Sequence, residues 1–391
     1  MKRMFVRALG LALSGMVFLS AGAAEQPLFT SEMEQAGLVS IGNTQRIHRA
    51  IDKARAGEEV TVAFIGGSIT EGALAVPQET GCYAALAAQH FAARFMPDAQ
   101  QLRYINAGIS GTPSLLGVTR SYDDVIAHAP DVVFVEFAVN DANDADAQMA
   151  YESLVRRLLE SESQPAVVLI FTVLHNGYTA QPHMQKIGAH YDLGMISVSD
   201  AITPQLKTGN MKWEDYSSDY AHPNNEGHAF IARMIDRLYA AAADTPAQPH
   251  TIPQEPVCSA DLARLVNLRK GDPAIVSEGS FPSAAGRCYT YNKGWRHWGN
   301  RGGSEPFVFT TNASVITLVN RQENNKKCGS AEVYVDGVLR TTLRGHDEKA
   351  WGYPVTQLLR IGKGPHTIEI RMAEGDEDKD FILLDVGLGG D

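Results

Sequence analysis

A serine, a histidine and an aspartate in this chain have the types and the surroundings that acyl-transfer chemistry requires. Ser68 stands in the stretch 60–72, VTVAFIGGSITEG, where an apolar run ends in a pair of glycines. A serine at such a turn can raise its hydroxyl at the carboxyl end of a parallel sheet, where ligand sites gather. Serine is a weak nucleophile at neutral pH, so this interpretation requires a base elsewhere in the chain.

His222 is the base that the sequence favours. It lies in SSDYAHPNNEGHAF, with Asp219 three residues before it and a Pro-Asn break before a predicted helix. Within one compact turn, Asp219 can accept a hydrogen bond from one ring nitrogen of His222 and leave the other nitrogen to face Ser68. This arrangement fixes the tautomer and stabilises the imidazolium, as a Ser-His-Asp triad requires. A helix cap beside a surface histidine is the alternative, and we expect His228 to be structural.

Acyl transfer also needs hydrogen-bond donors for the oxyanion, and two loops offer them. The stretch INAGISGTPS places Gly111 in a glycine-rich turn, and VFVEFAVNDAND places Asn140 directly after an apolar run. The amide of Gly111 can approach a ligand without hindrance from a side chain, and the Asn140 amide can point into the same site. Ordinary turn chemistry is the alternative for each loop taken alone.

Three other fingerprints that contain glycines are absent. No lysine follows Ser68 in the G-x-x-x-x-G-K-[ST] frame of a phosphate loop, and G-x-G-x-x-G does not occur. The G-x-S-x-G motif of α/β-hydrolases also fails, because Thr70 stands where its last glycine belongs. The phosphate-loop interpretation therefore fails, and Ser68 taken alone is either a nucleophile or part of an ordinary strand-to-helix turn.

The elements that must position these residues alternate between short apolar runs and longer amphipathic ones. Strand-like runs cover 60–65, 102–106, 132–139, 166–173 and 195–198, and helix-like stretches cover 79–95, 118–128, 145–162, 180–192 and 224–242. Apolar strands that alternate with helices indicate a parallel sheet covered on both faces. We expect an α/β sandwich with about five strands.

The character of the chain changes after the stretch 241–256, AAADTPAQPHTIPQEP, whose four prolines are typical of a linker. Beyond it, β-rich runs are separated by Asp-Gly and Gly-Lys-Gly-Pro turns, which predicts an antiparallel β-sandwich. The expected organisation is a signal peptide over 1–24, a catalytic domain over 25–243, a linker over 244–257 and a β-sandwich accessory domain over 258–391.

Composition and charge limit where the protein is expected to be found and which partners it can bind. The chain has 391 residues, of which 44% are hydrophobic, and a formal charge of −11. The first 24 residues have the pattern of an export signal, with Lys2, Arg3 and Arg7 followed by the apolar run 8–19 and the small residues 21–24. This run is shorter than the ~20 residues of a membrane span. Its removal takes the charge to −14, which disfavours nucleic acid and anionic membranes as partners. We expect a secreted or periplasmic protein without stable membrane insertion.

Export also permits disulfides among the four cysteines. Cys82 lies in a helix-like stretch, and we expect it to be a buried free thiol. The other three lie in the last third of the chain, so at most one bridge forms there, between Cys288 and either Cys258 or Cys328.

The joint pattern resembles the SGNH hydrolases of the GDSL esterase group. GGSIT is similar to the first block of that family, NAGISG to the second, AVND to the third and DYAHPN to the last. The resemblance covers about residues 58–242 and implies a flavodoxin-like three-layer α/β/α sandwich with no metal or organic cofactor. It departs from the usual pattern at Gly67, where the family usually has aspartate, and at Val139, where it usually has glycine.

The same resemblance implies a role for each site residue. Ser68 is the implied nucleophile, His222 its base and Asp219 the residue that orients His222. The amides of Ser68 and Gly111 and the side chain of Asn140 are the implied oxyanion hole. Substitution of one such donor costs about 10²–10³ in turnover.

The substrate is also suggested by resemblance. FIGGSITEG with VEFAVND resembles a bacterial branch of the family found with carbohydrate esterases, which implies the removal of acetyl groups from a polysaccharide or oligosaccharide. Alternatives are an O-acetyltransferase for cell-surface polysaccharide, a lipid or aryl esterase and a non-catalytic glycan-binding protein. In CYTYNKGWRHWGN, Trp295 and Trp298 can stack on sugar rings if they are exposed, and the alternative is that they pack in the sandwich core.

Overall fold

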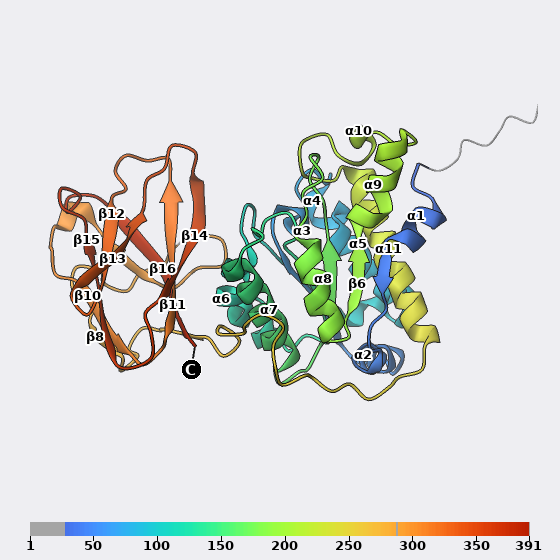
Figure 1. The fold of residues 1–391 in the computed structure, drawn as a ribbon, viewed down its shortest axis with the longest axis horizontal. Coiled ribbons are helices and arrows are strands. Elements are labelled where there is room, and N and C mark those ends of the chain that lie inside the picture. Colours follow the sequence, from blue (N-terminus) through green and yellow to red (C-terminus); the bar gives the residue numbers. More distant parts are fainter. Residues whose placement is uncertain (1–27, 287, 391) are drawn as a thin grey trace, which may run out of the picture.

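The computed structural model describes residues 28–286 and 288–390, which form an α/β domain followed by an antiparallel β domain (Figure 1). The signal peptide predicted for 1–24 lies outside the described residues. None of the helices in the described ranges is long and apolar enough to cross a membrane.

The first domain is built on a six-stranded sheet in the order β1-β6-β5-β4-β2-β3. The five strands expected from the sequence pair in parallel, which confirms the predicted fold class. They are β2 (Val60–Gly66), β3 (Leu102–Gly108), β4 (Val132–Glu136), β5 (Ala166–Phe171) and β6 (Gly194–Ser197). The sixth strand, β1 (Leu38–Ser40), was not predicted and pairs antiparallel with β6.

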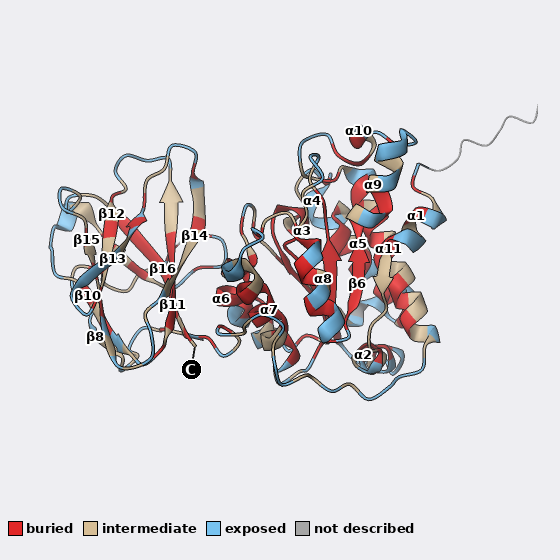
Figure 2. Ribbon diagram, in the orientation of Figure 1, coloured by how far each residue is buried: buried red, intermediate tan, exposed pale blue. Residues whose placement is uncertain are grey.

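Helices cover both faces of this sheet, so its central strands are buried throughout (Figure 2). Alternate residues of each strand enter two separate cores, as in Phe64 and Ile65 of β2. The first core also holds α1 (Ser31–Ala36), α2 (Gln45–Arg55), α5 (Tyr83–Phe95), α9 (Val198–Thr208) and α11 (Asn225–Asp244). The second core holds α6 (Ser114–Asp124), α7 (Ala145–Leu159) and α8 (Gln181–His190). The arrangement is a three-layer α/β/α sandwich.

Short helices occupy the loops of this domain. They are α3 (Ser68–Glu71), α4 (Gln78–Gly81), α10 (Trp213–Tyr216) and the 3-10 turns η1 (Ala99–Gln101) and η2 (Ile126–His128). The strand order places β2 beside both β3 and β4. Chain connections leave β2 and β4 in opposite directions along the sheet, and the crevice at their carboxyl ends is the expected place for a ligand.

The second domain is an antiparallel β-sandwich, as the sequence predicts. One sheet has the order β13-β12-β15-β10-β8 and the other the order β14-β11-β16-β7, with β9 paired to β16. The strands are β7 (Val266–Asn267), β8 (Ile275–Ser277), β9 (Trp295–His297), β10 (Phe307–Thr311), β11 (Val315–Glu323), β12 (Ser330–Val335), β13 (Val338–Arg344), β14 (Trp351–Arg360), β15 (His366–Met372) and β16 (Phe381–Gly389); η3 (Gly299–Arg301) follows β9. Side chains from both sheets share one core.

The proline-rich segment between the domains is bound along the surface of α7. The carboxylate of Glu152 accepts hydrogen bonds from the backbone amides of Val257 at 2.6 Å and Cys258 at 2.7 Å. Leu262 and Leu265 are buried in the core under α7. The β-sandwich then packs on α6, where Asn267 donates to the carbonyl of Thr119 at 3.0 Å.

All four cysteines are free thiols, which confirms the expectation for Cys82 and excludes the disulfide considered for Cys288. Cys288 is buried at the domain boundary, where its Sγ lies 3.4 Å from the carbonyl oxygen of Gly352. Cys258 is exposed and borders the α7 surface.

Candidate active site

Ser68, His222 and Asp219 form a continuous hydrogen-bonded series at the carboxyl end of β2. Ser68 begins α3 and is 8% exposed, and its Oγ lies 2.8 Å from Nε2 of His222. Nδ1 of His222 lies 2.7 Å from Oδ2 of Asp219. An ionised carboxylate only accepts hydrogen bonds, so Nδ1 carries the ring proton and Nε2 is free to accept one from Ser68. The structure thus brings together three residues that lie up to 154 positions apart.

Asp219 is held as a carboxylate by the turn that contains it. Its Oδ1 accepts the backbone amides of Ala221 at 2.8 Å and His222 at 2.7 Å. Burial opposes ionisation, but the hydrogen bonds from His222 and Ala221 lower the pKa of Asp219 below its usual value. Asp219 is therefore held as a carboxylate beside the ring of His222.

The turn itself is fixed at both ends. Asn224 caps α11, because its Oδ1 accepts the amide of Gly227 at 2.9 Å. Trp213 of α10 donates its indole N–H to the carbonyl of Asp219 at 2.6 Å. The ring of His175 stacks on Trp213 with centroids 5.1 Å apart. Trp213 and His175 were not predictable as neighbours of Asp219, because only the folded loop brings them together.

The two loops predicted to supply oxyanion donors border the same site. Gly111 follows β3 with a φ of +71°, a left-handed conformation that glycine adopts without strain. Asn140 follows β4, and its buried Oδ1 has no hydrogen-bond partner in the described part of the chain. A Cβ added to Gly67 would lie 2.3 Å from Oδ1 of Asn140. A side chain at position 67 would therefore displace Asn140.

A buried aspartate links these two loops. Oδ1 of Asp141 accepts the backbone amide of Ser114, the first residue of α6, at 2.7 Å. Burial raises the pKa of Asp141 to about 7 even though Ser114 hydrogen-bonds to it. The contact ties the turn of Asn140 to the helix that follows the Gly111 loop.

The second domain contributes a tryptophan to this region. Trp351, at the start of β14, is 60% exposed and stacks on Tyr353 with centroids 4.2 Å apart. A Cβ added to Gly111 would lie 3.2 Å from Cη2 of Trp351. Burial raises the pKa of Tyr289, and a hydrogen bond with Trp351 opposes that rise. Trp351, Tyr353 and Tyr289 form what we call the aromatic wall, beside the Gly111 loop.

Trp295 and Trp298 are not part of this wall. Trp295 is 3% exposed, packs on Phe307 with centroids 4.9 Å apart and donates its indole N–H to Glu278. Trp295 is therefore not exposed, as stacking on a sugar ring would require. It packs in the core of the sandwich, which was the alternative. Trp298 is half-buried, with the guanidinium of Arg301 lying 4.3 Å from its ring centroid.

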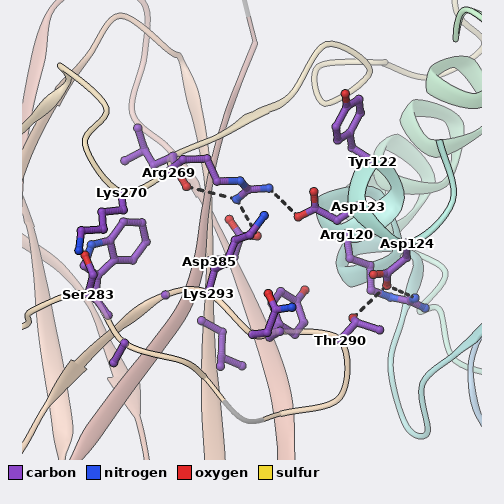
Figure 3. Close-up of a pocket in the computed structure, with 17 residues that line it drawn as sticks. Arg120, Tyr122, Asp123, Asp124, Arg269, Lys270, Ser283, Thr290, Lys293 and Asp385 are labelled. Carbon is purple, nitrogen blue, oxygen red and sulfur yellow. Dashed lines mark hydrogen bonds and ion pairs between the residues drawn. The ribbon is translucent and has the colours of Figure 1, made fainter. Parts of the chain in front are cut away.

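A cavity of about 660 Å³ lies between α6 and the β-sandwich (Figure 3). Arg269 crosses it and pairs with Asp123 of α6 at 2.7 Å and with Asp385 of β16 at 3.5 Å. Burial raises the pKa of Asp385 to about 6. Trp295 is the one predicted site residue that lines this cavity, which is therefore separate from the crevice at Ser68.

Comparisons with known proteins agree with this architecture. Residues 64–230 match the model of the GDSL-like Lipase/Acylhydrolase family. The chain is also similar to two crystal structures of a two-domain esterase, CEX, active on acetylated mannans, one of them co-crystallised with mannopentaose. Sequence identity is 28% in both, with TM-scores of 0.80 and 0.79, and each alignment covers 92% of this chain and 98% of that chain. None of the curated proteins matches the chain.

Proposed function

Because residues 64–230 match the model of the GDSL-like Lipase/Acylhydrolase family, we propose that this carboxylic ester hydrolase removes acetyl groups from a polysaccharide or oligosaccharide. The hydrogen-bonded series from Ser68 through His222 to Asp219 carries this proposal, because it is the arrangement that activates a serine hydroxyl. A carbohydrate substrate is supported by CEX, which is active on acetylated mannans and aligns with 92% of the chain.

The first half of the reaction transfers the acetyl group to the protein. Ser68 Oγ attacks the ester carbonyl carbon as Nε2 of His222 takes the hydroxyl proton, and Asp219 stabilises the resulting imidazolium. The negative charge moves to the carbonyl oxygen, where the amides of Ser68 and Gly111 and Nδ2 of Asn140 are the donors that receive it. When the tetrahedral intermediate collapses, His222 gives its proton to the departing sugar oxygen.

The second half regenerates the serine. A water molecule gives a proton to Nε2 of His222 and attacks the acetyl carbonyl of the ester on Ser68. The same donors stabilise the second oxyanion, acetate leaves, and the proton returns to Ser68 Oγ. Each step uses groups of this chain, so the net reaction consumes one water and produces a free sugar hydroxyl and acetic acid.

The aromatic wall supports a glycan rather than a lipid ester as substrate. Aromatic faces bury a large area with few rotatable bonds, and they pack well against the C–H faces of sugar rings. Trp351 is exposed beside Gly111, so a sugar whose ester lies at Ser68 can place a ring against the indole. We further propose that the protein is exported, because the basic and apolar pattern of residues 1–24 has the form of an export signal.

The experiment that tests this function is acetate release from acetylated mannan, acetylated xylan and chemically deacetylated controls, with long-chain 4-nitrophenyl esters as the competing substrate class. We expect acetate from at least one acetylated glycan, with a higher kcat/KM than for any long-chain ester. Faster hydrolysis of the long-chain esters would contradict the proposal. Transfer of acetyl groups to an added acceptor glycan without release of acetate would contradict it as well.

A further inference from the structure

We propose that Glu136 is a positioning residue for catalysis, whose buried carboxylate fixes the segment that carries Ser68 against the segment that carries Asn140. This inference rests on the proposed function, because it assigns the two segments to nucleophile and oxyanion donor. Glu136 itself does not touch Ser68 Oγ and acts through the backbone on either side of it.

Glu136 is the last residue of β4 and is 0% exposed. Its Oε1 accepts the hydroxyl of Thr172 at 2.6 Å, and its Oε2 accepts the hydroxyl of Thr70 at 3.3 Å. The backbone amides of Gly67 and Ala138 also donate to the carboxylate. Two side chains and two amides thus converge on one carboxylate below the site.

These four donors belong to the segments that carry the proposed chemistry. Gly67 directly precedes Ser68, and Thr70 follows it by two residues in α3. Ala138 lies two residues before Asn140, and Thr172 directly follows β5. Removal of the carboxylate would release both sides of the nucleophile turn and the start of the Asn140 turn at once.

Thr70 is itself held in the orientation that reaches Glu136. The hydroxyls of Tyr83 and Thr70 lie 2.8 Å apart, so Tyr83 can donate to Thr70 while Thr70 donates to Glu136. A Cβ added to Gly66 would lie 2.1 Å from Oγ1 of Thr70. The threonine is therefore packed directly against the end of β2, and the glycine is needed there to leave it room.

Burial of a carboxylate at this position costs desolvation free energy, and an apolar side chain of similar size would avoid that cost. The other four residues of β4 are apolar and buried, and an apolar side chain would continue that pattern. Burial raises the pKa of Glu136 to about 7 despite the hydrogen bonds that it accepts. Buried polar groups are tolerated where their hydrogen bonds are made, and here those bonds are made to the site segments.

The expected consequence is a loss of turnover with little change in substrate binding. Oxyanion donors act over a narrow range of distance, so a small shift of Ser68 relative to Asn140 weakens transition-state stabilisation. Substrate binding at the aromatic wall does not depend on that separation. A change in kcat without a change in KM is the sign of an interaction used only in the transition state.

Glu136→Gln is the test, and Glu152→Gln is its matched control. Glu152 is also 0% exposed, and it accepts the hydroxyl of Tyr191 and the amides of Val257 and Cys258 at α7. The full chain of each variant is compared with wild type by kcat and KM for 4-nitrophenyl acetate and by thermal unfolding. We expect Glu136→Gln to lower kcat at least about tenfold with KM within about twofold. Glu152→Gln should keep the wild-type kcat even where it lowers Tm.

Equal kcat values for Glu136→Gln and wild type would overturn the inference, as would an equal loss of kcat in both glutamine variants. If Glu136→Gln does not fold, Thr172→Val decides, because it removes one donor at nearly constant volume and should lower kcat several-fold. An unchanged kcat in Thr172→Val would then count against Glu136. Wild-type activity tests the proposed function separately, since these comparisons are ratios to wild type.

Discussion

Trp351 of the β-sandwich lies against Gly111 of the α/β domain, where a Cβ on the glycine would be 3.2 Å from Cη2 of the indole. Gly111 belongs to the loop that we expect to stabilise the oxyanion. A residue of the β-sandwich therefore borders the site on one side. The shape of the site depends on how the β-sandwich packs on the α/β domain. The packing of the β-sandwich on α6 keeps Trp351 in this place.

Gly111→Ala should lower kcat without unfolding the protein. The new Cβ would meet Trp351 in a backbone conformation with φ +71°, so the amide would have to move from its place. Loss of one oxyanion donor costs about 10²–10³ in turnover, and we expect about 10². Gly209→Ala is the control, because Gly209 has a φ of +74° but no atom near its added Cβ. Equal kcat values in the two variants would exclude this role for Gly111.

Trp351→Ala should weaken the reaction with a glycan more than that with a small ester. Loss of the exposed indole removes a face for a sugar ring, and aromatic packing contributes about 1 kcal/mol beyond area burial. We expect kcat/KM for an acetylated oligosaccharide to fall about fivefold more than that for 4-nitrophenyl acetate. Trp298→Ala, in the same domain, should change both substrates alike. Proportional losses in Trp351→Ala would show that the wall does not bind substrate.

The sequence was sufficient where local chemistry determines structure. Strands β2, β4 and β5 were predictable because each is a short, almost continuous apolar run, as a strand buried on both faces must be. Strand β3 lies at the edge of the sheet and is only partly buried, and it was predictable from its place in the alternation of strands and helices. Strand β1 was not, because Leu38–Ser40 is three residues long and carries no alternation. Its place beside β6 depends on tertiary pairing.

The positions of the aromatic residues also depend on tertiary structure. The sequence pointed to Trp295 and Trp298 because they cluster with tyrosines, yet Trp295 belongs to the sandwich core. The place of Trp351 depends on how the second domain docks on α6, which no local pattern reports. Glu136 was likewise not predictable as a positioning residue, because it ends an otherwise apolar strand and its hydrogen-bond donors come from three separate segments.

Asp219→Asn should reduce kcat strongly while leaving the fold intact. The new amide would donate toward Nδ1 of His222 and move the ring proton to Nε2, which then cannot accept the proton of Ser68. We expect a loss of about 10³ or more at neutral pH, with partial recovery at higher pH. Asp215→Asn is the control, since Asp215 of α10 accepts the amide of Lys212, and no hydrogen bond joins Asp215 to His222 in the described part of the chain. Near-wild-type kcat in Asp219→Asn would contradict the triad.

His228 should affect the stability of the fold rather than turnover, and its contribution to stability should depend on pH. Its Nδ1 accepts the amide of Tyr83 at 3.1 Å, so Nε2 carries the proton and lies 3.1 Å from the carbonyl of Ala73. Burial lowers the pKa of His228 from 6.5 to about 4. Between these values the unfolded chain binds a proton that the folded protein does not, so stability falls as pH drops from 6.5 toward 4.

His228→Asn removes this contribution, and thermal unfolding across the same range measures it. Tm of the wild type should fall more steeply than Tm of His228→Asn as the solution is acidified. The raised pKa values of Glu136 and Asp141 increase the stability of the folded protein as the pH falls. This contribution is present in both proteins, so it cancels when their Tm values are compared. Parallel curves would mean that His228 is not held neutral by burial.

The nucleophile is tested most directly by mass spectrometry of the intact protein after reaction with a serine-reactive fluorophosphonate. We predict one adduct per chain, mapped by proteolysis to Ser68, together with loss of acetate release. Ser68→Ala should gain no adduct and should not hydrolyse acetyl esters above the background rate. An adduct on a residue other than Ser68, or hydrolysis by Ser68→Ala at the wild-type rate, would contradict the proposed mechanism.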